Sequence, residues 1–204
     1  TIEAGKTAEA SFTNEYRAAS VELKGDTALG GMKTLVGRDM KDGETFSFAL
    51  SGDADTKKAI DGGDIVIKGY DNKTAQATAT ITGAKNEETK AFAFDNVTFK
   101  KAGTYTFTIE EQVPDQDSDG MTWDRHKATA TVTVTDKNGQ LGATVAYSGT
   151  TTSEDRPLFE NRYDSSTDVS GGTKATISAS KTLNGRNLKA GEFTFKLAPR
   201  PNTD

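Results

Sequence analysis

The stretch "ATATVTVTD", from Ala128 to Asp136, alternates an apolar residue with a threonine. This two-residue period is typical of a strand with one face in the core and the other in water. The same pattern recurs in "QATATITG" (76–83), "KAFAFDNVTF" (90–99) and "TYTFTIEEQ" (104–112). No stretch shows a convincing long helical period. The sequence therefore predicts an all-β fold, a mostly antiparallel β-sandwich.

The composition of the 204 residues excludes several classes of protein. The net charge of -5 argues against nucleic acid as a partner, because nucleic acid selects a basic face. The chain has no cysteine, which excludes a disulfide, a thiolate metal site and a cysteine nucleophile. No apolar run approaches the length of a membrane span, so no membrane insertion is expected. No signal peptide or sorting signal is visible, and we expect both to lie outside this fragment.

Two phrases occur twice in the chain. "KTLVGRDMKDGETFSFAL" begins at Lys33, and the similar "KTLNGRNLKAGEFTFKL" begins at Lys181, 148 residues later. "FTNEY" contains Asn14 and "FENRY" contains Asn161, 147 residues later. Two independent phrases with nearly the same offset indicate a tandem repeat.

The phrases divide the chain into four parts. Residues 1–16 are predicted to be the last strand of a preceding repeat, and residues 17–163 one complete module. Residues 164–174 are rich in Ser, Gly and Asp and are predicted to be a linker. Residues 175–204 are predicted to start the next repeat. The neighbouring repeats of the same polypeptide are thus the expected partners.

These motifs carry a family resemblance. The stretches "MKTLVGRDMKDGETFSFAL", "GTYTFTIEEQ", "GMTWDRHKATATVTVTDKNGQLGATVAY" and "FENRY" occur in this order within 17–163. Together they resemble the streptococcal pilin isopeptide-linkage domain of Gram-positive backbone pilins and repeat adhesins. The resemblance implies an immunoglobulin-like β-sandwich of the collagen-adhesin B type. Between about 51 and 90, the match is only of general β character.

The resemblance also implies a covalent cross-link made by the domain itself. It assigns Lys33 and Asn161 as the two residues joined by an amide bond. It assigns Glu110, the first glutamate of "YTFTIEE", as the acid that promotes the reaction, with Glu111 on the opposite face. The aromatic residues expected to keep the site dry are Phe46, Phe48, Phe107, Phe159 and Tyr163.

The chemistry of the residue types agrees with this assignment. A lysine attacks a carboxamide only as the neutral amine, and free lysine is protonated at pH 7. Burial lowers the pKa of a lysine and raises that of a glutamate, so both can be neutral in a core. The glutamic acid can then polarise the Asn161 carbonyl and pass a proton to the leaving ammonia. Because each molecule reacts once, the protein is not expected to be an enzyme, and no cofactor is expected.

Simpler interpretations exist for each of the three residues. Lys33 could be an ordinary surface lysine, and Asn161 could be a turn residue that closes a strand. Their places in repeated, aromatic-flanked phrases favour the cross-link. The assignment of Glu110 is weaker, since a one-residue slip exchanges it with Glu111.

Other polar residues have weaker signals. Asp115, Asp117 and Asp119 alternate before a glycine like the start of a calcium loop, but the closing glutamate position is His126. We interpret this segment as a solvated loop with only a weak metal candidate. His126 is the single histidine and has no triad partners in the sequence.

Several further residues have structural interpretations. Trp123 and Tyr147 are expected to pack rather than to form a sugar platform, and "DKNGQ" (136–140) is expected to be a hairpin turn. Asn14 and Lys181 match the cross-link motif but belong to neighbouring repeats, with their own partners outside the chain. The two could pair with each other, within or between chains.

The sequence therefore predicts a structural stalk repeat of a Gram-positive surface adhesin or pilus-like protein. The expected location is extracellular, at the bacterial cell surface or cell wall. The alternative is a ligand-binding adhesin module whose loops contact a host protein or glycan. A host ligand could also be bound by another domain of the parent protein.

Overall fold

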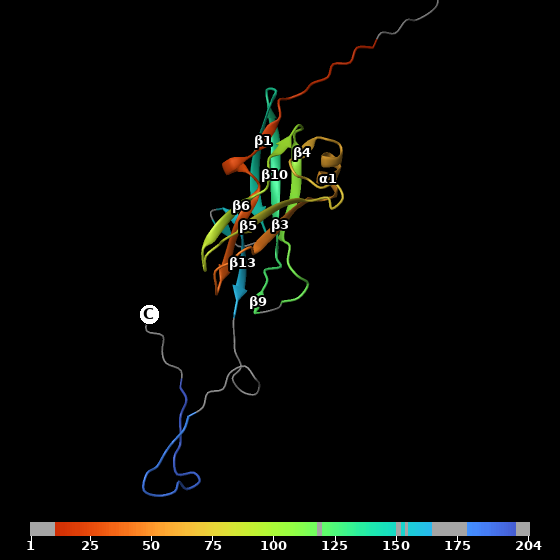
Figure 1. The fold of residues 1–204 in the computed structure, drawn as a ribbon. Coiled ribbons are helices and arrows are strands. Elements are labelled where there is room, and N and C mark those ends of the chain that lie inside the picture. The colour runs from red at the N-terminus through yellow and green to blue at the C-terminus, as the bar shows by residue number, and fades with distance from the viewer. Residues whose placement is uncertain (1–10, 118–119, 150–151, 154, 165–178, 199–204) are drawn as a thin grey trace, which may run out of the picture. The chain divides into compact units, whose positions relative to one another are not determined.

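The computed structural model describes residues 11–117, 120–149, 152–153, 155–164 and 179–198 (Figure 1). The chain divides into two compact units, Thr1–Ser165 and Ser166–Asp204. In the first unit, the described chain enters the sandwich beside the tip of one hairpin and leaves at the opposite end (Figure 1).

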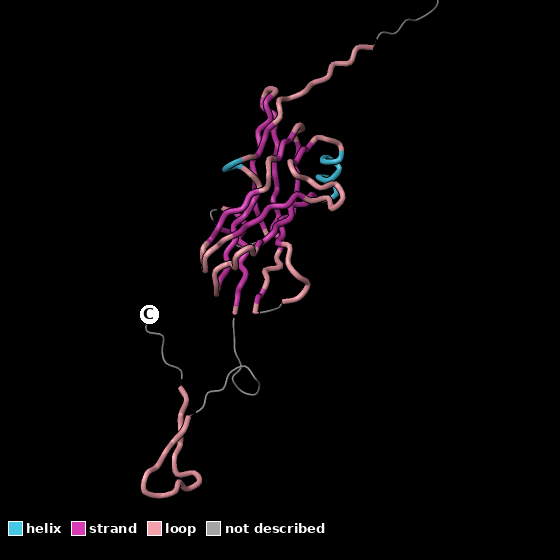
Figure 2. The backbone as a smooth tube through the Cα atoms, in the orientation of Figure 1, coloured by secondary structure: helices cyan, strands magenta, loops and turns pink. Residues whose placement is uncertain are grey.

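The first unit is almost entirely β, as the alternating sequence predicts (Figure 2). In chain order, its elements are β1 (Val21–Leu23), the 3-10 turn η1 (Gly25–Thr27), β2 (Gly30–Val36), β3 (Thr45–Gly52), α1 (Ala54–Asp61), β4 (Ile65–Ile67), β5 (Ala77–Thr82), β6 (Thr89–Ala93), β7 (Val97–Phe99), β8 (Gly103–Glu111), β9 (Met121–Thr122), β10 (Lys127–Lys137), β11 (Gln140–Ser148), β12 (Thr152–Ser153) and β13 (Arg156–Tyr163).

Three sheets form a sandwich-like structure. One has the strand order β11-β10-β8-β3-β5, and a second has the order β12-β13-β2-β6, with β9 beside β13. A small third sheet has the order β1-β7-β4. The core contains fully buried aromatic side chains, including Phe46, Phe48, Phe99, Phe107 and Phe159. The predicted fold class is thus confirmed.

Two features of the fold were not predicted from the sequence. The pairing of β2 with β13 is parallel, with Lys33 opposite Phe159, within a sandwich whose other strand pairs are antiparallel, as expected. The short helix α1 was not foreseen. Asp53 caps the helix by accepting a hydrogen bond from the Thr56 N–H. The helix has eight residues, of which only Thr56 is buried. Its sequence therefore shows no repeating apolar face that would have predicted a helix.

The hairpin predicted at 136–140 joins β10 and β11. Lys137 pairs with Gln140, and both Asn138 (φ 55°) and Gly139 (φ 87°) have positive φ angles, as a two-residue hairpin turn requires. The incoming chain docks at this tip. The Tyr16 hydroxyl donates to Asp136 at 2.8 Å, and the Ala19 N–H donates to the Gly139 carbonyl at 2.7 Å.

The repeated phrase forms the same turn in both units. In the first unit, the Arg38 guanidinium forms a double hydrogen bond with the Glu44 carboxylate, at 2.6 and 2.7 Å. In the second unit, Arg186 makes the corresponding pair with Glu192. The described residues of the second unit, 179–198, contain no strand.

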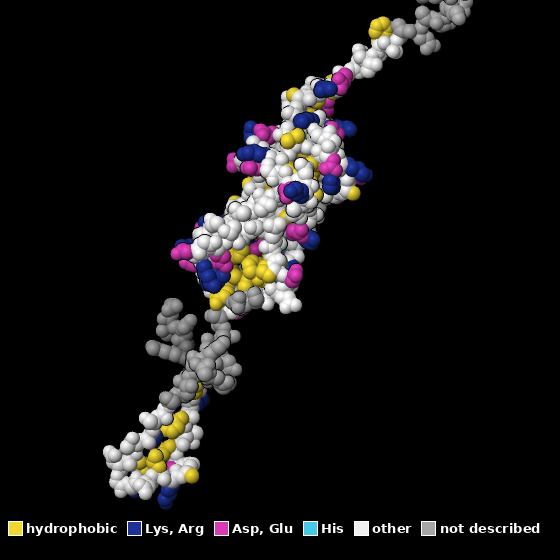
Figure 3. Space-filling view, turned by 45° about the vertical axis from the view of Figure 1, so that its right-hand side comes forward, with side chains coloured by type: hydrophobic (Ala, Val, Ile, Leu, Met, Phe, Trp, Pro, Cys, Tyr) yellow, Lys and Arg dark blue, Asp and Glu magenta, His cyan; other side chains and the backbone are white. Residues whose placement is uncertain are grey.

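On the visible face of the first unit, charges of both signs are interspersed, and hydrophobic side chains gather in a patch near its lower end (Figure 3). Among the described residues, no helix is long and apolar enough to cross a membrane.

Candidate functional site

A buried lysine lies at the centre of the candidate site. Lys33 is on β2, which runs between β13 and β6, and its exposed fraction is 0%. An isolated ammonium group is rarely buried in this way, because the loss of hydration costs several kcal/mol, of the order of the penalty for a buried ion. A specific partner is therefore required.

The partner is Glu111, the last residue of β8 in the facing sheet. Lys33 Nζ lies 2.8 Å from Glu111 Oε2, and both side chains are fully buried. Tyr105, Phe107 and Ile109 are buried on the same strand, and the two-residue period continues this face to Glu111.

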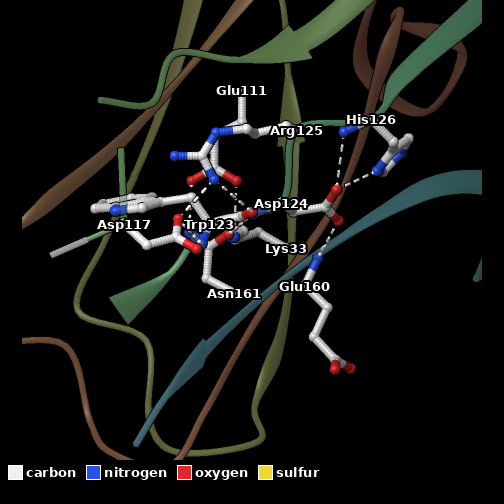
Figure 4. Close-up of polar contacts among 9 residues, drawn as sticks. All are labelled: Lys33, Glu111, Asp117, Trp123, Asp124, Arg125, His126, Glu160 and Asn161. Carbon is white, nitrogen blue, oxygen red and sulfur yellow. Dashed lines mark hydrogen bonds and ion pairs between the residues drawn. The ribbon is translucent and has the colours of Figure 1, made fainter. Parts of the chain in front are cut away.

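Asn161 on β13 contacts the same carboxylate from the other side. Its Nδ2 donates to Glu111 Oε1 at 2.7 Å, and the exposed fraction of the residue is 0%. Its Oδ1 accepts a 2.8 Å hydrogen bond from the backbone N–H of Asp124. Because a backbone N–H can only donate, this contact fixes which end of the amide is the oxygen. Figure 4 shows Lys33 and Asn161 converging below the Glu111 carboxylate.

Aromatic rings enclose this group of three residues. Lys33 Nζ lies 4.7 Å from the centre of the Phe46 ring, and Trp123 packs edge-on against Phe46 with ring centres 5.8 Å apart. Phe159 is buried opposite Lys33. The Phe48 ring is tilted against the Phe159 ring, with ring centres 5.4 Å apart. Water is thus excluded from the site.

Two of the predicted wall residues lie elsewhere. Phe107 is buried and meets Phe99 edge-on, with ring centres 6.4 Å apart. The Tyr163 ring lies against the Arg38 guanidinium at 4.8 Å. Trp123 and Tyr147 pack against the core, in agreement with the packing role expected for them.

Burial shifts the pKa values of the two charged groups toward each other. The loss of hydration lowers the pKa of Lys33 and raises the pKa of Glu111. The mutual attraction of the pair opposes both shifts without cancelling either. Burial therefore favours the neutral form of each group more than water does.

The structure does not place Glu110, the predicted promoting acid, beside Lys33 and Asn161; Glu111 takes that position. The Glu110 carboxylate pairs with Lys127 Nζ at 2.5 Å on the outer face of the sheet. Successive residues of a strand point to opposite faces of the sheet. Glu110 therefore points to the surface, and its neighbour Glu111 points into the core. The two-residue period of β8 contained the signal, because the buried positions 105, 107 and 109 lead to Glu111.

The structure also contains a contact that the sequence did not indicate. The backbone N–H of Asp124 holds the Asn161 carbonyl oxygen. Every residue except proline has such a group, so no residue type marks its position.

The weak calcium candidate is not supported by the described residues. Asp115 is exposed, and Asp117 accepts hydrogen bonds from Arg125 and from the Trp123 N–H. Asp119 lies outside the described residues. Within the described ranges, no group of three or more His, Cys, Asp or Glu could hold a metal ion.

The motif residues near the two ends are exposed. Asn14 is outside any strand, and Lys181 lies over the Phe193 ring at 5.1 Å. The Lys181–Phe193 contact resembles that of Lys33 with Phe46. The assignment of the ends to neighbouring repeats stays a prediction.

The geometry is suited to amide formation. The Lys33 amine and the Asn161 carboxamide each hydrogen-bond to one oxygen of the same Glu111 carboxylate. A main-chain N–H donates to the oxygen of the Asn161 carboxamide.

The family of Spy0128-like isopeptide-containing domains matches residues 29–164, which is more than half of the chain. The chain belongs to this family. The match includes β2, β8 and β13, the three strands that hold Lys33, Glu111 and Asn161. No curated protein is significantly similar to the chain.

Solved structures of Streptococcus pyogenes pilins are similar to part of the chain. The major pilin is 19% identical, with a TM-score of 0.41, over 67% of this chain and 50% of the pilin. A mutant of the major pilin is 22% identical, with a TM-score of 0.43 and the same coverage. The T-13 major pilin is 21% identical, with a TM-score of 0.40, over 72% of this chain and 54% of the pilin. The chain thus matches about half the length of these proteins.

Proposed function

We propose that this domain is a structural repeat of a Gram-positive pilus-like protein or surface adhesin, held closed by an amide bond between Lys33 and Asn161. The observation that supports the proposal is the buried contact of both residues with Glu111. A buried lysine, glutamate and asparagine in such contact are costly as a mere packing arrangement, because apolar residues would fill the space more favourably.

The bond forms in one turnover. The neutral Lys33 amine attacks Cγ of Asn161, and the carbonyl oxygen becomes negatively charged. Glu111 accepts a proton from Nζ and delivers its own to Nδ2, so that ammonia leaves and the acid is regenerated. The contacts of 2.8 and 2.7 Å to the two carboxylate oxygens place both proton positions within reach. Holding the two reactants together replaces several kcal/mol of activation free energy, out of the roughly 7–11 kcal/mol available from proximity.

The position of the bond suggests a mechanical role. Lys33 and Asn161 lie on neighbouring parallel strands, and the chain enters and leaves the first unit at opposite ends (Figure 1). A bond between β2 and β13 transmits a pulling force directly from one to the other. The chain between them then cannot extend under load, and proteases meet a closed domain.

The remaining parts of the proposal concern the parent protein. Its location is the bacterial cell surface or cell wall, and its neighbouring repeats are the partners of this domain. The resemblance of residues 17–163 to isopeptide-linkage domains of Gram-positive pilins supports this location. The domain acts as a structural element and turns over no substrate.

The intact mass of the denatured chain tests the proposal. Formation of one Asn–Lys bond releases one ammonia, so the mass is expected to be about 17 Da below the calculated value. Lys33→Ala and Glu111→Ala should restore the full mass. Glu110→Ala, one residue away on the outer face, is the matched control and should keep the deficit.

Other outcomes have distinct meanings. A deficit of two ammonia molecules would show that Asn14 and Lys181 also react. The full calculated mass for the wild-type chain would overturn the cross-link and leave the ligand-binding adhesin module as the better proposal.

A further inference from the structure

The segment Asp124–His126 grips the last strand beside the reacting asparagine. The segment contacts three consecutive residues of β13. The His126 ring stacks on Phe159, with ring centres 4.4 Å apart. The Asp124 carboxylate accepts a 2.8 Å hydrogen bond from the Glu160 N–H, and the Asp124 N–H donates to Asn161. Figure 4 shows the Asp124 side chain between His126 and Glu160. These contacts fix the segment against β13 in position and orientation.

Both oxygens of the Asp124 carboxylate are engaged in this arrangement. Oδ2 accepts from Glu160, while Oδ1 accepts from the His126 N–H at 3.1 Å and meets His126 Nδ1 at 2.5 Å. The side chain therefore ties its own backbone N–H to the strand that carries Asn161. None of these contacts is made to Lys33 or Glu111.

We propose that the Asp124 N–H is the oxyanion donor of the cross-linking reaction and that the Asp124 carboxylate and the His126 ring are positioning residues that aim it. This inference rests on the proposed function. When Nζ of Lys33 bonds to Cγ of Asn161, the π electrons of the carbonyl move onto Oδ1. The N–H is already 2.8 Å from that oxygen and stabilises the charge. When the Cγ–Nδ2 bond breaks and ammonia leaves, the electron pair returns to form the amide carbonyl.

The backbone N–H of Asp124 cannot be removed by substitution, so its role is tested by changing the Asp124 side chain that positions it. The full chain is made in a short pulse of cell-free synthesis, quenched in urea, and diluted to start folding. Intact mass then follows the loss of ammonia with time. Asp124→Ala should slow this loss roughly tenfold or more, since removing an oxyanion donor commonly costs about 100-fold or more. Asp124→Asn keeps part of the acceptor set and should give an intermediate rate.

Asp117→Ala is the matched control. Asp117 holds the same loop through Arg125 and the Trp123 N–H but contacts neither Asn161 nor β13 in any interaction described above. Its rate should stay within about twofold of the wild-type rate, as for a surface substitution. A merely structural role of the loop would slow Asp117→Ala and Asp124→Ala alike.

A second measurement applies even if Asp124→Ala does not fold. In the Lys33→Met chain, which cannot react, the Asp124 amide proton should exchange slowly with solvent, and adding Asn161→Ala should accelerate its exchange. Equal exchange in both chains would overturn the inference. It is likewise overturned if wild type and Asp124→Ala cross-link at equal rates, an outcome that leaves the proposed function intact. A wild-type chain of full mass overturns both.

Discussion

At the scale of single residues, desolvation decides the chemistry. In water, lysine is a neutral nucleophile only above its ordinary pKa of 10.5, and glutamate is an acid only below 4.5. The two forms that the reaction needs therefore never coexist in an open peptide. Burial lowers the first pKa and raises the second, which brings the pH ranges of the two forms closer together.

We predict a bell-shaped pH dependence for the rate of cross-linking. On the acid side, the rate falls as Lys33 gains a proton, at a pH below its ordinary pKa. On the alkaline side, it falls as Glu111 loses its proton, at a pH above its ordinary pKa. The pulse-and-dilution mass measurement, repeated across a pH series, gives both limbs.

Glu111→Gln is the control for this profile, because glutamine cannot exchange the proton and should give no bond at any pH. A wild-type rate that rises steadily with pH, as for the free amine alone, would show that Glu111 is not the acid.

At the scale of elements, the pairing of β2 with β13 positions the site. The repeated phrase explains this contact, because Gly37 follows β2 directly and has a φ of 101°, a conformation that residues other than glycine rarely adopt. A Cβ atom at this position would lie 1.9 Å from the Tyr163 carbonyl oxygen. Arg38, the next residue, then packs on the Tyr163 ring. The glycine and arginine of the first phrase thus contact the end of the second.

We predict that Gly37→Ala destabilises the domain by about 1–3 kcal/mol, the cost of strained backbone plus the displaced end of β13. Urea unfolding in the Lys33→Ala background measures this free energy without the cross-link. Gly142→Ala is the matched control, because nothing lies within 4 Å of the added Cβ and its φ is not positive. Equal free energies of unfolding for the two variants would contradict the close approach.

At the scale of the whole first unit, the proposed bond joins two residues that lie 128 positions apart, Lys33 and Asn161. A cross-link stabilises chiefly by restricting the unfolded chain, and a loop of this length corresponds to about 5 kcal/mol. The chain has no cysteine with which a disulfide could give the same effect. This amount is comparable with the total stability of many domains.

We predict that Lys33→Ala lowers the free energy of unfolding by about 5 kcal/mol. The removal of a buried side chain adds to this loss. The melting temperature should fall by roughly 10–20 °C, since each kcal/mol corresponds to about 2–4 °C at this size. Calorimetry measures the shift.

Lys90→Ala is the matched control for Lys33→Ala. Lys90 is the neighbour of Lys33 across the β2–β6 pair, and its ammonium contacts only exposed carbonyl groups. Its effect should stay within about 0.5 kcal/mol. A similar small effect of Lys33→Ala would rule out a stabilising cross-link.

The sequence by itself determined the features that side-chain patterns record. Alternation of Thr with apolar residues specified the strands, and the repeated phrases marked the ends of the module. The family resemblance of the motifs assigned Lys33 and Asn161 as a pair. The alternation in β8 places Glu110 and Glu111 on opposite faces, but it does not say which face is buried. Tertiary structure made that decision, along with the parallel pairing of β2 and β13 and the donor from Asp124. Pairing between distant strands and contacts of main-chain groups depend on three-dimensional packing, and neither leaves a periodic pattern or a residue type in the chain.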